Sequence, residues 1–523
     1  MGKGRAPGKP AGQLKEGNSK MYPIDFFYRA ALRYPERMAI ESRNESVSYA
    51  ALADQVSALA GAIRKLDDEP GSMVGLCAQN SVAYIVAMLA IMAAGKVWVP
   101  LNYRSTPTEI RRITTVIKPS IIIQDSYGSA LTDGLENVHI INTDDIPLLI
   151  EQFTGLHLPE AIRSDDDIQA IKFTGGTTGM PKGVMQPYRA WVAVIINQIH
   201  GWKITTNDKF VICAPISHGT GTYVLPVLAQ GGCLVLSESA EAADIVHAFR
   251  EQKGTMTFMP PTLIYKLIAA AKSEKDFPCL RLLIYGGAGM PAEKIARAQD
   301  FFGNVLATTY GQTEAPQIAT LIGPETLAQP QYRASVGQVS WFTDIAIVDQ
   351  QQHRLPPNKT GEIVIRGDLV MTGYWRLPEK TAETIKNGWL HTGDVGFIDE
   401  KGFLFIKDRI RDVIITGGFN VYPIDVENVL SQHVGVYESA VFGITDEKWG
   451  ESVNAAVQLH ADSAVTADEL KRLVREKLGP VHTPKNIYFF ASLPRSPVGK
   501  VLKKTIQELV LAGMQDTTET RQL

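Results

Sequence analysis

Cysteine is scarce in this chain and is nowhere closely paired. The 523 residues include four cysteines, Cys77, Cys213, Cys233 and Cys279, which stand far apart and form no Cys-x-x-Cys pair. This spacing argues against both a zinc site and a disulfide framework. We therefore expect a protein of a reducing compartment, with the cytoplasm as its location.

A long hydrophobic run is also missing. The longest apolar stretch, residues 82–94, is followed by Gly95 and Lys96 and falls short of the roughly 20 residues that a membrane-spanning helix needs. It predicts a buried crossover helix and no membrane span. Residues 1–20 are rich in Gly, Lys and Pro with almost nothing apolar, so they contain no hydrophobic region for export. We expect them to form a disordered tail, because they cannot bury enough apolar surface to fold.

A strong excess of charge of one sign is absent as well. The net charge is -3 at pH 7, so no overall positive field attracts nucleic acid or an anionic membrane, and we expect neither as a partner. The composition, 45% hydrophobic and 20% charged, is that of a globular protein with an ample core. Because the chain is too long for one ordinary domain, we expect two or more.

Short β-branched runs alternate with longer helical patterns through the first part of the chain. They occupy residues 73–77, 121–124, 210–214 and 234–236. This alternation is typical of parallel βαβ units, so the sequence predicts a large α/β domain.

The pattern changes after about Ala334. Period-2 runs at residues 344–348 and 362–366 predict a small antiparallel sheet or barrel attached to the main domain. A final α+β segment follows Arg411, with strand-like runs at residues 439–443, 454–459 and 487–490 and a helical pattern at 467–478. The chain has no Ser/Gly-rich linker, so the junction at residues 408–412 is expected to be a short hinge, which favours rotation over free tethering.

A loop rich in glycine and threonine stands near the end of the first third of the chain. Residues 173–184 read FTGGTTGMPKGV. Backbone N–H groups of glycines can approach an anion closely, threonine hydroxyls add donors, and a lysine adds a point charge. The residues concerned are Thr174, Gly175, Gly176, Thr177, Thr178, Gly179 and Lys182. The loop therefore predicts a phosphate site, most simply for a nucleotide; a plain flexible turn is the alternative.

This loop differs from the two commonest phosphate-binding patterns. A P-loop has four residues between its glycines and then Gly-Lys-Ser/Thr, whereas three residues separate Gly175 from Gly179 and Gly183 follows Lys182. The Gly287-Ala288-Gly289 segment lacks the third glycine of a dinucleotide fingerprint. Two more strand-like runs lead into loops, at residues 282–289 and 305–314. Open α/β sheets bind ligands at the carboxyl ends of their strands, so we expect the three loops to converge on one ligand.

Five segments, taken together and in order, resemble the adenylate-forming superfamily, which includes acyl-CoA synthetases, firefly-type luciferases and the adenylation domains of peptide synthetases. FTGGTTGMPKGV resembles the phosphate loop of that family, YGQTEA at 310–315 its adenine and magnesium motif, and GWLHTGD at 388–394 its ribose-binding motif. KDRIRDVIITGGFNVYPIDVE at 407–427 resembles the hinge and the coenzyme A loop, and PRSPVGKVLKK at 494–504 the loop of the catalytic lysine. The match spans most of the chain.

The resemblance implies an organisation and a reaction. It implies an N-terminal domain at residues 21–408 that binds ATP and the acid, a hinge at 409–412, and a mobile C-terminal lid domain at 413–523 that carries the catalytic lysine. The acid and MgATP would first give an acyl-adenylate and pyrophosphate. The C-terminal domain would then rotate and admit coenzyme A, whose thiol takes the acyl group and releases AMP.

The resemblance assigns the nucleotide site to residues whose chemistry fits. Tyr310 offers an aromatic face to adenine, Gly286 and Gly287 allow close backbone approach, and Asp394 can accept hydrogen bonds from both ribose hydroxyls. Gly311 adjoins Tyr310 in the motif, and Arg409 is expected to be a second ribose contact. Outside these motifs Tyr310 would be read as a core aromatic residue and Asp394 as a cap of a turn or helix.

Glu314 and Thr313 are expected at the phosphates. One carboxylate beside a phosphate site is sufficient for Mg²⁺, which prefers one or two carboxylates together with phosphate oxygens and water. Thr313 would donate to the α-phosphate. The alternative for Glu314 is a solvated acid at the start of a helix.

Lys500 is the expected catalytic lysine. In adenylation two anions approach each other, because a carboxylate oxygen attacks the α-phosphorus of ATP, and an ammonium group can stabilise the charge of the transition state. Its neighbours Lys503 and Lys504 have the character of surface lysines, and only the family motif separates Lys500 from them.

The coenzyme A site and the hinge are also assigned by resemblance. Gly417 and Gly418 would leave room for the narrow pantetheine arm, with Phe419 in the same loop. Trp449 is a further candidate for contact with coenzyme A, for which a packing role is the alternative. At the hinge the family usually has Asp or Lys where this chain has Arg411, and rotation is still expected.

The acid pocket is expected after His218, a position that orients the carboxylate in the family; a satisfied core histidine is the alternative. Residues 219–225 include no acidic side chain to pair with an ammonium group, so the acid should have an uncharged, mainly apolar body, aryl or fatty. The depth of the pocket would depend on Thr220, Val224, Met259, Pro261 and Pro316.

Three functions are compatible with these observations. The first is an acyl- or aryl-CoA synthetase, the second an adenylate-forming enzyme that transfers its acyl group to an acyl carrier protein or to oxygen, and the third a nucleotide-binding protein without activity. Lys500 and Glu314 argue against the third, and Gly417 and Gly418 favour the first. No carrier domain follows, which favours a stand-alone ligase, as a monomer or a homodimer.

Overall fold

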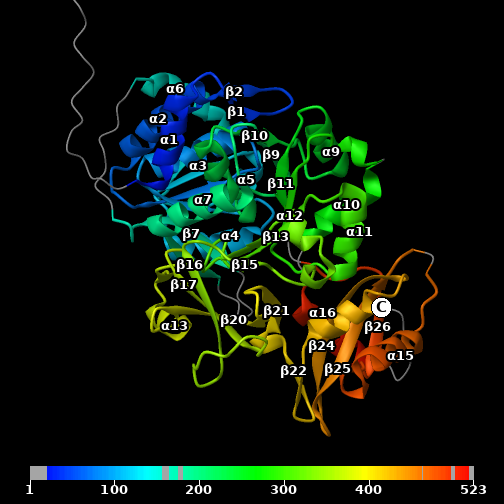
Figure 1. The fold of residues 1–523 in the computed structure, drawn as a ribbon. Coiled ribbons are helices and arrows are strands. Elements are labelled where there is room, and N and C mark those ends of the chain that lie inside the picture. The colour runs from blue at the N-terminus through cyan, green and yellow to red at the C-terminus, as the bar shows by residue number, and fades with distance from the viewer. Residues whose placement is uncertain are drawn as a thin grey trace, which may run out of the picture.

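The computed structural model describes residues 21–155, 164–174, 181–271, 273–461, 463–495 and 501–516. The tail predicted for residues 1–20 lies outside them. Figure 1 shows the described elements in two unequal parts, a large one that holds most strands and helices and a smaller one at the C-terminal end.

A mixed sheet forms one side of the large part, in the order β18-β8-β7-β4-β3-β5-β6. Strands β7 to β6 along this path are parallel, whereas β8 and β18 are antiparallel. The strands are β3 (Met73–Cys77), β4 (Val97–Pro100), β5 (Ile121–Gln124), β6 (His139–Asn142), β7 (Ile168–Thr174), β8 (Lys182–Pro187) and β18 (Gly373–Tyr374). Every residue of β3, β4 and β5 is buried, as expected for parallel strands with both faces covered.

A second mixed sheet has the order β15-β14-β13-β12-β11-β9-β10-β1-β2 and is parallel from β13 to β1. Its strands are β1 (Met38–Glu41), β2 (Ser46–Ser48), β9 (Lys209–Ile212), β10 (Cys233–Leu236), β11 (Met256–Met259), β12 (Leu282–Tyr285), β13 (Leu306–Tyr310), β14 (Thr320–Ile322) and β15 (Gln338–Val339). The β-branched runs of the sequence thus become parallel strands, and the predicted α/β class is confirmed.

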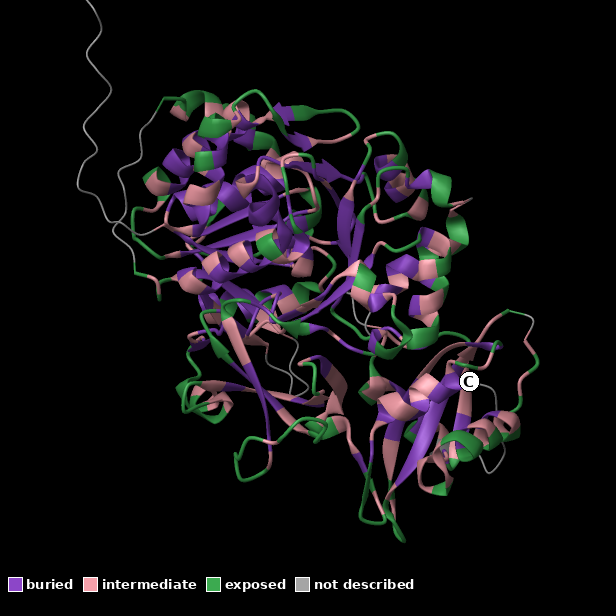
Figure 2. Ribbon diagram, in the orientation of Figure 1, coloured by how far each residue is buried: buried purple, intermediate pink, exposed green. Residues whose placement is uncertain are grey.

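Helices lie between the two sheets and on their outer faces. The inner helices share one apolar cluster with both sheets, which Figure 2 shows as the buried centre of the molecule. They are α1 (Pro23–Arg33), α2 (Tyr49–Leu66), α3 (Val82–Ala93), α7 (Tyr188–Trp202) and α8 (Val224–Ala229), with α6 (Ile146–Phe153) against α2. The outer helices are α4 (Pro107–Ile117) and α5 (Ser126–Thr132) on the first sheet, and α9 (Ala242–Arg250), α10 (Pro261–Ala270), α11 (Ala292–Phe302) and α12 (Pro324–Leu327) on the second.

The apolar run at residues 82–94 forms α3, so the predicted buried helix is confirmed. Ser81 caps its first turn by accepting a hydrogen bond from the Tyr84 amide, which satisfies a donor that the helix leaves free. The helix is apolar on all sides and buried over nearly its whole length, as expected for a helix inside a domain.

An antiparallel sheet packs below the large sheets in Figure 1. Its order is β16-β17-β20-β19, and β21 also pairs with β20, on the edge opposite β17. The strands are β16 (Thr343–Val348), β17 (Gly361–Gly367), β19 (Ile385–Lys386), β20 (Trp389–Ile398) and β21 (Leu404–Arg409), with helix α13 (Pro378–Thr384) before β19. The period-2 runs become β16 and β17, as predicted.

The C-terminal part is a small α+β unit. Its sheet has the order β23-β22-β25-β24, with β26 parallel to β25. Helices α14 and α15 share one apolar cluster with this sheet and α16 shares another. The elements are β22 (Ile414–Thr416), β23 (Phe419–Val421), α14 (Pro423–Leu430), β24 (Val436–Asp446), β25 (Gly450–Leu459), α15 (Ala467–Leu478), β26 (Asn486–Phe490) and α16 (Lys503–Asp516). The predicted strands and helix all lie within these bounds.

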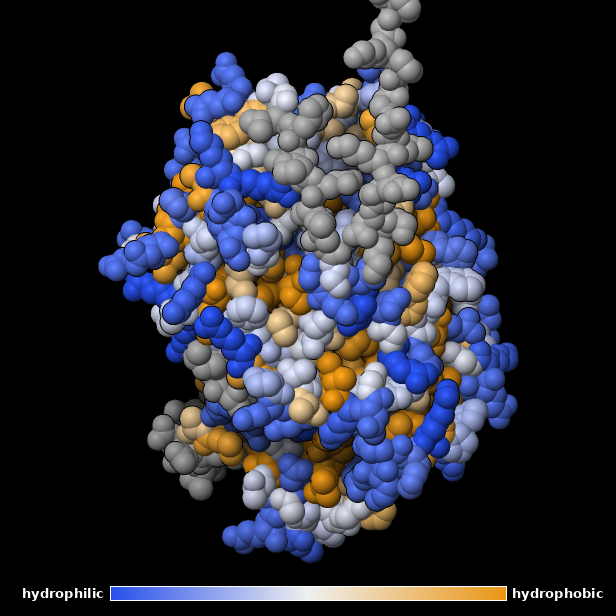
Figure 3. All heavy atoms as spheres, turned by 90° about the vertical axis from the view of Figure 1, so that its left-hand side faces the viewer, coloured by the Kyte–Doolittle hydropathy of each residue, from blue (hydrophilic) through white to orange (hydrophobic). Residues whose placement is uncertain are grey.

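The surface and the cysteines add two observations. No helix of the described residues has the length and hydropathy that crossing a membrane requires. On the face in Figure 3, apolar side chains are interspersed with polar ones. All four cysteines are free thiols, three of them buried and Cys279 exposed.

Candidate active site

A hydrogen bond links the first sheet to the predicted loop after β13 of the second sheet. The Gln186 amide nitrogen, on β8 of the first sheet, donates to the Thr313 carbonyl oxygen at 2.9 Å. The loop that contains Thr313 follows β13 of the second sheet, and β13 is the neighbour of β12, which leads to Gly286. The loops after β12 and β13 therefore leave the same edge of the second sheet. The convergence of the glycine–threonine loop with them remains a prediction.

Asp394 receives contacts from two other motifs. Its Oδ2 accepts a hydrogen bond from the Tyr310 hydroxyl at 2.7 Å and another from the Gln312 amide at 2.6 Å. Its Oδ1 lies 3.5 Å from Arg409 Nε, because β20 and β21 place Asp394 and Arg409 opposite each other. The structure thus brings Tyr310, Asp394 and Arg409 together. It adds Gln312, which stands inside YGQTEA but is not predicted from the sequence as a site residue.

Tyr310 ends β13 in an almost closed environment. Its side chain belongs to the apolar cluster with Ala315 and Ala319, and only 7% of the residue is exposed. Burial, and next the Asp394 carboxylate, raise the pKa of the Tyr310 phenol well above its ordinary value. The phenol is therefore a proton donor to Asp394 at any physiological pH.

Glu314 and Lys182 are joined by a residue that no motif indicates. The Tyr374 hydroxyl donates to Glu314 Oε1 at 2.8 Å, and Lys182 Nζ lies 5.3 Å from the centroid of the Tyr374 ring. This contact arises because β18, which ends at Tyr374, pairs with β8, which begins at Lys182. Burial and the Glu314 carboxylate raise the pKa of Tyr374, so its phenol also remains a donor.

Glu314 provides a single carboxylate rather than a metal cage. The described residues contain no cluster of three His, Cys, Asp or Glu side chains that could enclose a metal ion. One Glu314 oxygen is bonded to Tyr374. A carboxylate of this kind fits Mg²⁺ that is held mainly by phosphate oxygens and water.

Two predicted groups fall wholly or partly outside the described residues. Gly175, Gly176, Thr177, Thr178 and Gly179 lie there, as does Lys500. The ends of the predicted phosphate loop are described, and Thr174 and Lys182 face each other across the β7–β8 ladder.

His218 begins the turn that leads to α8. Its Nδ1 lies 2.9 Å from the Ser217 hydroxyl oxygen. Burial, and next the charges of Lys172 and Arg104, together lower the pKa of the imidazole to about 4. The ring is therefore neutral near pH 7.

The residues predicted for the acid pocket do not all lie together. Thr220 and Val224 are buried in and directly after the short helix η2 (Gly219–Tyr223). Met259 packs in the cluster on the outer face of the second sheet, whereas Phe258 faces the inner cluster, because side chains alternate along a strand. The structure therefore places Phe258, and not Met259, on the side of Thr220 and Val224.

Phe258 and Gln317 fill the space between two glycines. A Cβ atom on Gly286 would lie 2.9 Å from Phe258 Cε2 and 3.3 Å from Gln317 Nε2, and one on Gly219 would meet the same two side chains at 2.9 and 3.3 Å. The Gln317 Oε1 is buried and accepts no hydrogen bond from the described residues. Gln317 directly follows the predicted pocket residue Pro316. This adjacency is the one feature of the sequence that could have indicated Gln317 as a site residue.

The predicted coenzyme A residues lie together in the C-terminal part. The Gly417 amide donates to the Trp449 carbonyl oxygen at 2.8 Å, and a Cβ on Gly417 would lie 2.8 Å from the Trp449 ring. Gly417 and Gly418 have φ of 57° and 84°, so both favour glycine. Phe419 and Trp449 are more than half exposed. Figure 1 shows β22, which precedes this loop, away from β7 and β13.

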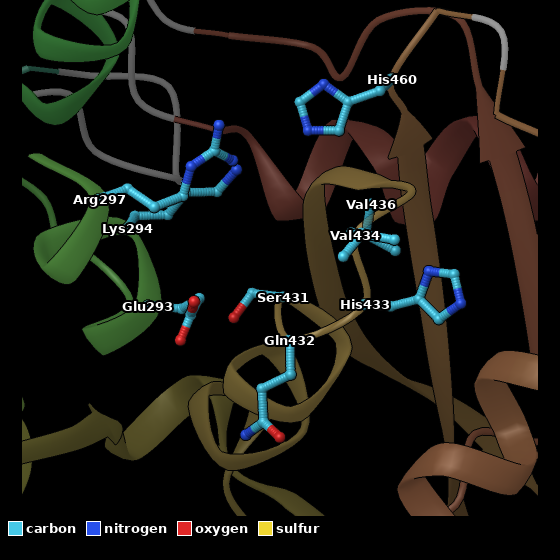
Figure 4. Close-up of a pocket in the computed structure, with 9 residues that line it drawn as sticks. All are labelled: Glu293, Lys294, Arg297, Ser431, Gln432, His433, Val434, Val436 and His460. Atoms are coloured by element: carbon cyan, nitrogen blue, oxygen red, sulfur yellow. The ribbon is translucent and has the colours of Figure 1, made fainter. Parts of the chain in front are cut away.

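The C-terminal part also contacts the large part. A cavity of about 440 Å³ separates α11, with Glu293, Lys294 and Arg297, from the turn after α14 and from His460 (Figure 4). Lys294 Nζ lies 5.6 Å from the centroid of the Tyr437 ring. Next to the predicted hinge, Lys407 Nζ and Asp425 Oδ1 lie 2.9 Å apart. Arg411 itself is half exposed and lies 3.6 Å from Asp412.

Comparisons with known proteins cover both parts of the chain. A family model described as "AMP-binding enzyme" matches residues 27–375, and a second, "AMP-binding enzyme C-terminal domain", matches residues 425–500. A feruloyl-CoA synthase of an Amycolatopsis species is 32% identical over 92% of this chain and 97% of its own. A medium/long-chain fatty-acid–CoA ligase of Mycobacterium tuberculosis is 34% identical over 73% of this chain and 68% of its own. The ATP-bound MatB of Rhodopseudomonas palustris has 27% identity and a TM-score of 0.86 over 94% of this chain and 99% of its own.

Proposed function

The chain belongs to the adenylate-forming AMP-binding enzyme family, and from this premise we propose that it is an ATP-dependent acid:CoA ligase. It is an enzyme of the AMP-forming acid–thiol ligase family that uses ATP and a carboxylic acid. The proposal adds coenzyme A as the acceptor and the roles of individual residues. The observation that carries it is the contact of Tyr310, Gln312 and Arg409 with the one carboxylate of Asp394.

Asp394 is assigned to the ribose of ATP. A carboxylate is an acceptor and can bind two vicinal hydroxyls. Tyr310 and Gln312 fix its Oδ2, and Arg409 faces its Oδ1, so the group is already oriented before the nucleotide arrives. Such preorganisation lowers the entropy cost of binding. Adenine would lie near the Tyr310 ring, Gly311 and the backbone of Gly286 and Gly287.

Lys182, Tyr374 and Glu314 are assigned to the phosphates and their metal ion. Lys182 would contact the departing β- and γ-phosphates with Thr174 and the glycine–threonine loop, and Thr313 the α-phosphate. Tyr374 holds Glu314 in place through a hydrogen bond, and Glu314 would be a ligand of Mg²⁺. Bound Mg²⁺ would neutralise phosphate charge as the pyrophosphate leaves.

The first half-reaction is in-line attack of the acid carboxylate on the α-phosphorus. A new O–P bond forms, the bond to the β-phosphate oxygen breaks, and pyrophosphate leaves with the electron pair. Lys500 is assigned to the charge that develops in this step. His218, neutral at the pH of the reaction, would orient the carboxylate as a hydrogen-bond donor.

The second half-reaction needs a different arrangement of the C-terminal domain. We assign the pivot to Arg411 within residues 409–412, with rotation breaking the Lys407–Asp425 ion pair and carrying Gly417, Gly418, Phe419 and Trp449 to the acyl-adenylate. The thiolate of coenzyme A then attacks the acyl carbonyl, and AMP leaves. Glycines at positive φ keep the loop narrow where the pantetheine arm would pass.

The acid is expected to be aryl or fatty. Thr220, Val224, Phe258 and Pro316 provide a mostly apolar lining, and the described residues at 219–225 include no acid to hold an ammonium group. The relatives include both a feruloyl-CoA synthase and a medium/long-chain fatty-acid–CoA ligase. The Gln317 Oε1, which accepts no hydrogen bond from the described residues, favours an acid that has a hydrogen-bond donor on its body.

The experiment is a two-part assay on a panel of acids that includes ferulate, cinnamate and decanoate. Pyrophosphate release reports adenylation, and loss of the free thiol with appearance of AMP reports the thioester. We expect both from the same acid. Pyrophosphate–ATP exchange without any thioester would contradict coenzyme A as the acyl acceptor but would still support adenylation of the acid.

A further inference from the structure

Lys172 is a buried lysine at the predicted active site that the mechanism above does not use. It lies on β7, two residues before Thr174, and is 8% exposed. Its Nζ donates to the His218 carbonyl oxygen at 3.3 Å. The side chain thus joins the strand that leads to the phosphate loop to the residue at the entrance of the acid pocket.

Within the described part of the chain, no carboxylate pairs with this ammonium group. Among the described residues, none forms an ion pair with Lys172, and removal from water alone lowers its pKa to about 7. Lys96, a second buried lysine in the large part, shows the usual solution: its Nζ lies 3.3 Å from Asp67 Oδ1 and donates to Ser72 and to the Glu69 carbonyl. A buried charge without a partner is costly, so the difference between the two lysines requires a reason.

The surroundings of Lys172 contain an excess of hydrogen-bond donors. Its Nζ lies 5.0 Å from the centroid of the Trp98 ring and 5.5 Å from that of Trp191. The indole N–H groups of both tryptophans are buried and reach no acceptor within the described part of the chain. The nearby charged groups that influence His218 are Lys172 itself and Arg104, both cationic. The missing component is therefore an acceptor with negative charge.

We propose that Lys172 is the counter-cation of the substrate carboxylate, and that it positions the acid beside His218 before adenylation. This proposal rests on the proposed function, because the anion that would pair with Lys172 is the carboxylic acid substrate of the first half-reaction. The carboxylate would complete an ion pair in a site from which water is largely excluded, where such a pair is strong.

The same contact would distinguish the substrate from the product of the first half-reaction. The acid binds as an anion, and pairing keeps the Lys172 amine protonated. When the carboxylate oxygen becomes part of the acyl-phosphate, the acyl carbonyl no longer carries a full charge, so Lys172 can return its proton to water. The acyl group is then held less firmly as the thiol approaches.

The test compares Lys172→Met, which is neutral, with Lys172→Arg, which stays charged at all relevant pH values. We measure kcat/KM for the acid at saturating ATP, and KM for ATP at saturating acid, from pH 6 to pH 9. In the wild type, kcat/KM for the acid should fall as the pH rises through about 7, since the amine loses its charge; His218 is already neutral there and Arg104 remains charged.

The two variants should separate charge from shape. Lys172→Met should lower kcat/KM for the acid on the order of 10-fold to 100-fold below pH 7 and abolish its decline above pH 7, with KM for ATP unchanged. Lys172→Arg should restore acid affinity and keep it up to pH 9. Lys96→Met is the control for loss of a buried lysine and should leave both KM values unchanged while it lowers stability.

Three results would overturn the proposal. A rise in KM for ATP instead of the acid would show that the anion is a phosphate. Equal losses at every pH in both variants would show that Lys172 only supports the fold around His218. A wild-type profile that is flat from pH 6 to pH 9 would contradict the proposal even if Lys172→Met fails to fold. By contrast, a wild-type enzyme that forms no adenylate from any acid would refute the proposed function itself.

Discussion

The Tyr310 phenol donates a 2.7 Å hydrogen bond to the Asp394 carboxylate, across 84 positions of the chain. Both residues are more than nine-tenths buried. The contact joins the end of β13 to the middle of β20, and so connects one of the large sheets to the antiparallel sheet. It also places a phenol beside the carboxylate that we assign to the ribose.

Tyr310→Phe tests this contact because it removes the hydroxyl and keeps the ring. We expect KM for ATP to rise roughly 3-fold to 10-fold, the usual net value of one hydrogen bond, while KM for the acid stays constant. ATP–pyrophosphate exchange measures both. Tyr49→Phe is the matched control, since it removes another buried phenol, bonded to the carbonyls of Leu228 and Gly232. An equal rise in KM for ATP in Tyr49→Phe would contradict the assignment of Tyr310 to the nucleotide site.

Lys500→Ala should affect one half-reaction only. Adenylation should fall on the order of 10² to 10³, by analogy with the loss of one donor that stabilises a transition-state charge. Thioester formation from supplied acyl-adenylate should survive. Lys504→Ala is the control: its Nζ lies 3.9 Å from Glu508 and its side chain is 63% exposed. Equal loss in both half-reactions would contradict the assignment of separate domain arrangements.

Gly417→Ala should affect the other half-reaction. The residue has φ of 57°, and a Cβ would lie 2.8 Å from the Trp449 ring, so alanine is strained and displaces the indole. We expect thioester formation from acyl-adenylate to fall while pyrophosphate release is retained. Gly479→Ala provides a comparison in the same part of the chain, because Gly479 has φ of 83° with open space around it. Loss of adenylation in Gly417→Ala alone would argue that this loop serves the first half-reaction.

His218 should make the fold sensitive to acid. Its pKa falls from 6.5 to about 4 on folding, so the unfolded chain binds more protons between these pH values. Its contribution to stability is therefore complete above pH 6.5 and is lost as the pH falls towards 4. Urea unfolding measures the free energy of unfolding at pH 7 and at pH 5. The decrease from pH 7 to pH 5 should be up to about 2 kcal/mol larger in the wild type than in His218→Gln. An identical loss in the two proteins would show that His218 is hydrated.

The sequence predicts the elements better than it predicts the contacts between them. Hydrophobic runs and their period identify β3, α3, β16 and β17, because local pattern determines which face is buried. Tyr374 escapes prediction because its role comes from the pairing of β18 with β8, between segments far apart in the chain. The sequence predicts Met259 for the pocket, and only the position of β11 in its sheet shows that its neighbour Phe258 faces the inner cluster instead.

The motifs identify the residues at the site but do not predict the hydrogen bonds between them. Asp394 and Arg409 are readable from sequence, whereas the Gln312 amide on Asp394 depends on how a loop from one sheet meets a strand of another. The functional assignment of these residues remains a prediction. The predicted domain limits likewise remain predictions, because contacts such as Lys407–Asp425 cross the expected boundary.

The pairing of Asp394 with Arg409 also determines how the protein can be divided. β21 forms its ladder with β20, so every strand partner of Arg409 precedes the hinge in the chain. A fragment that ends after Asp412 would lose the Lys407–Asp425 ion pair and the Asp408 contact with the Ile424 amide. It would keep the ladder that sets Arg409 against Asp394. Nucleotide capture could therefore be studied on that fragment separately from acyl transfer.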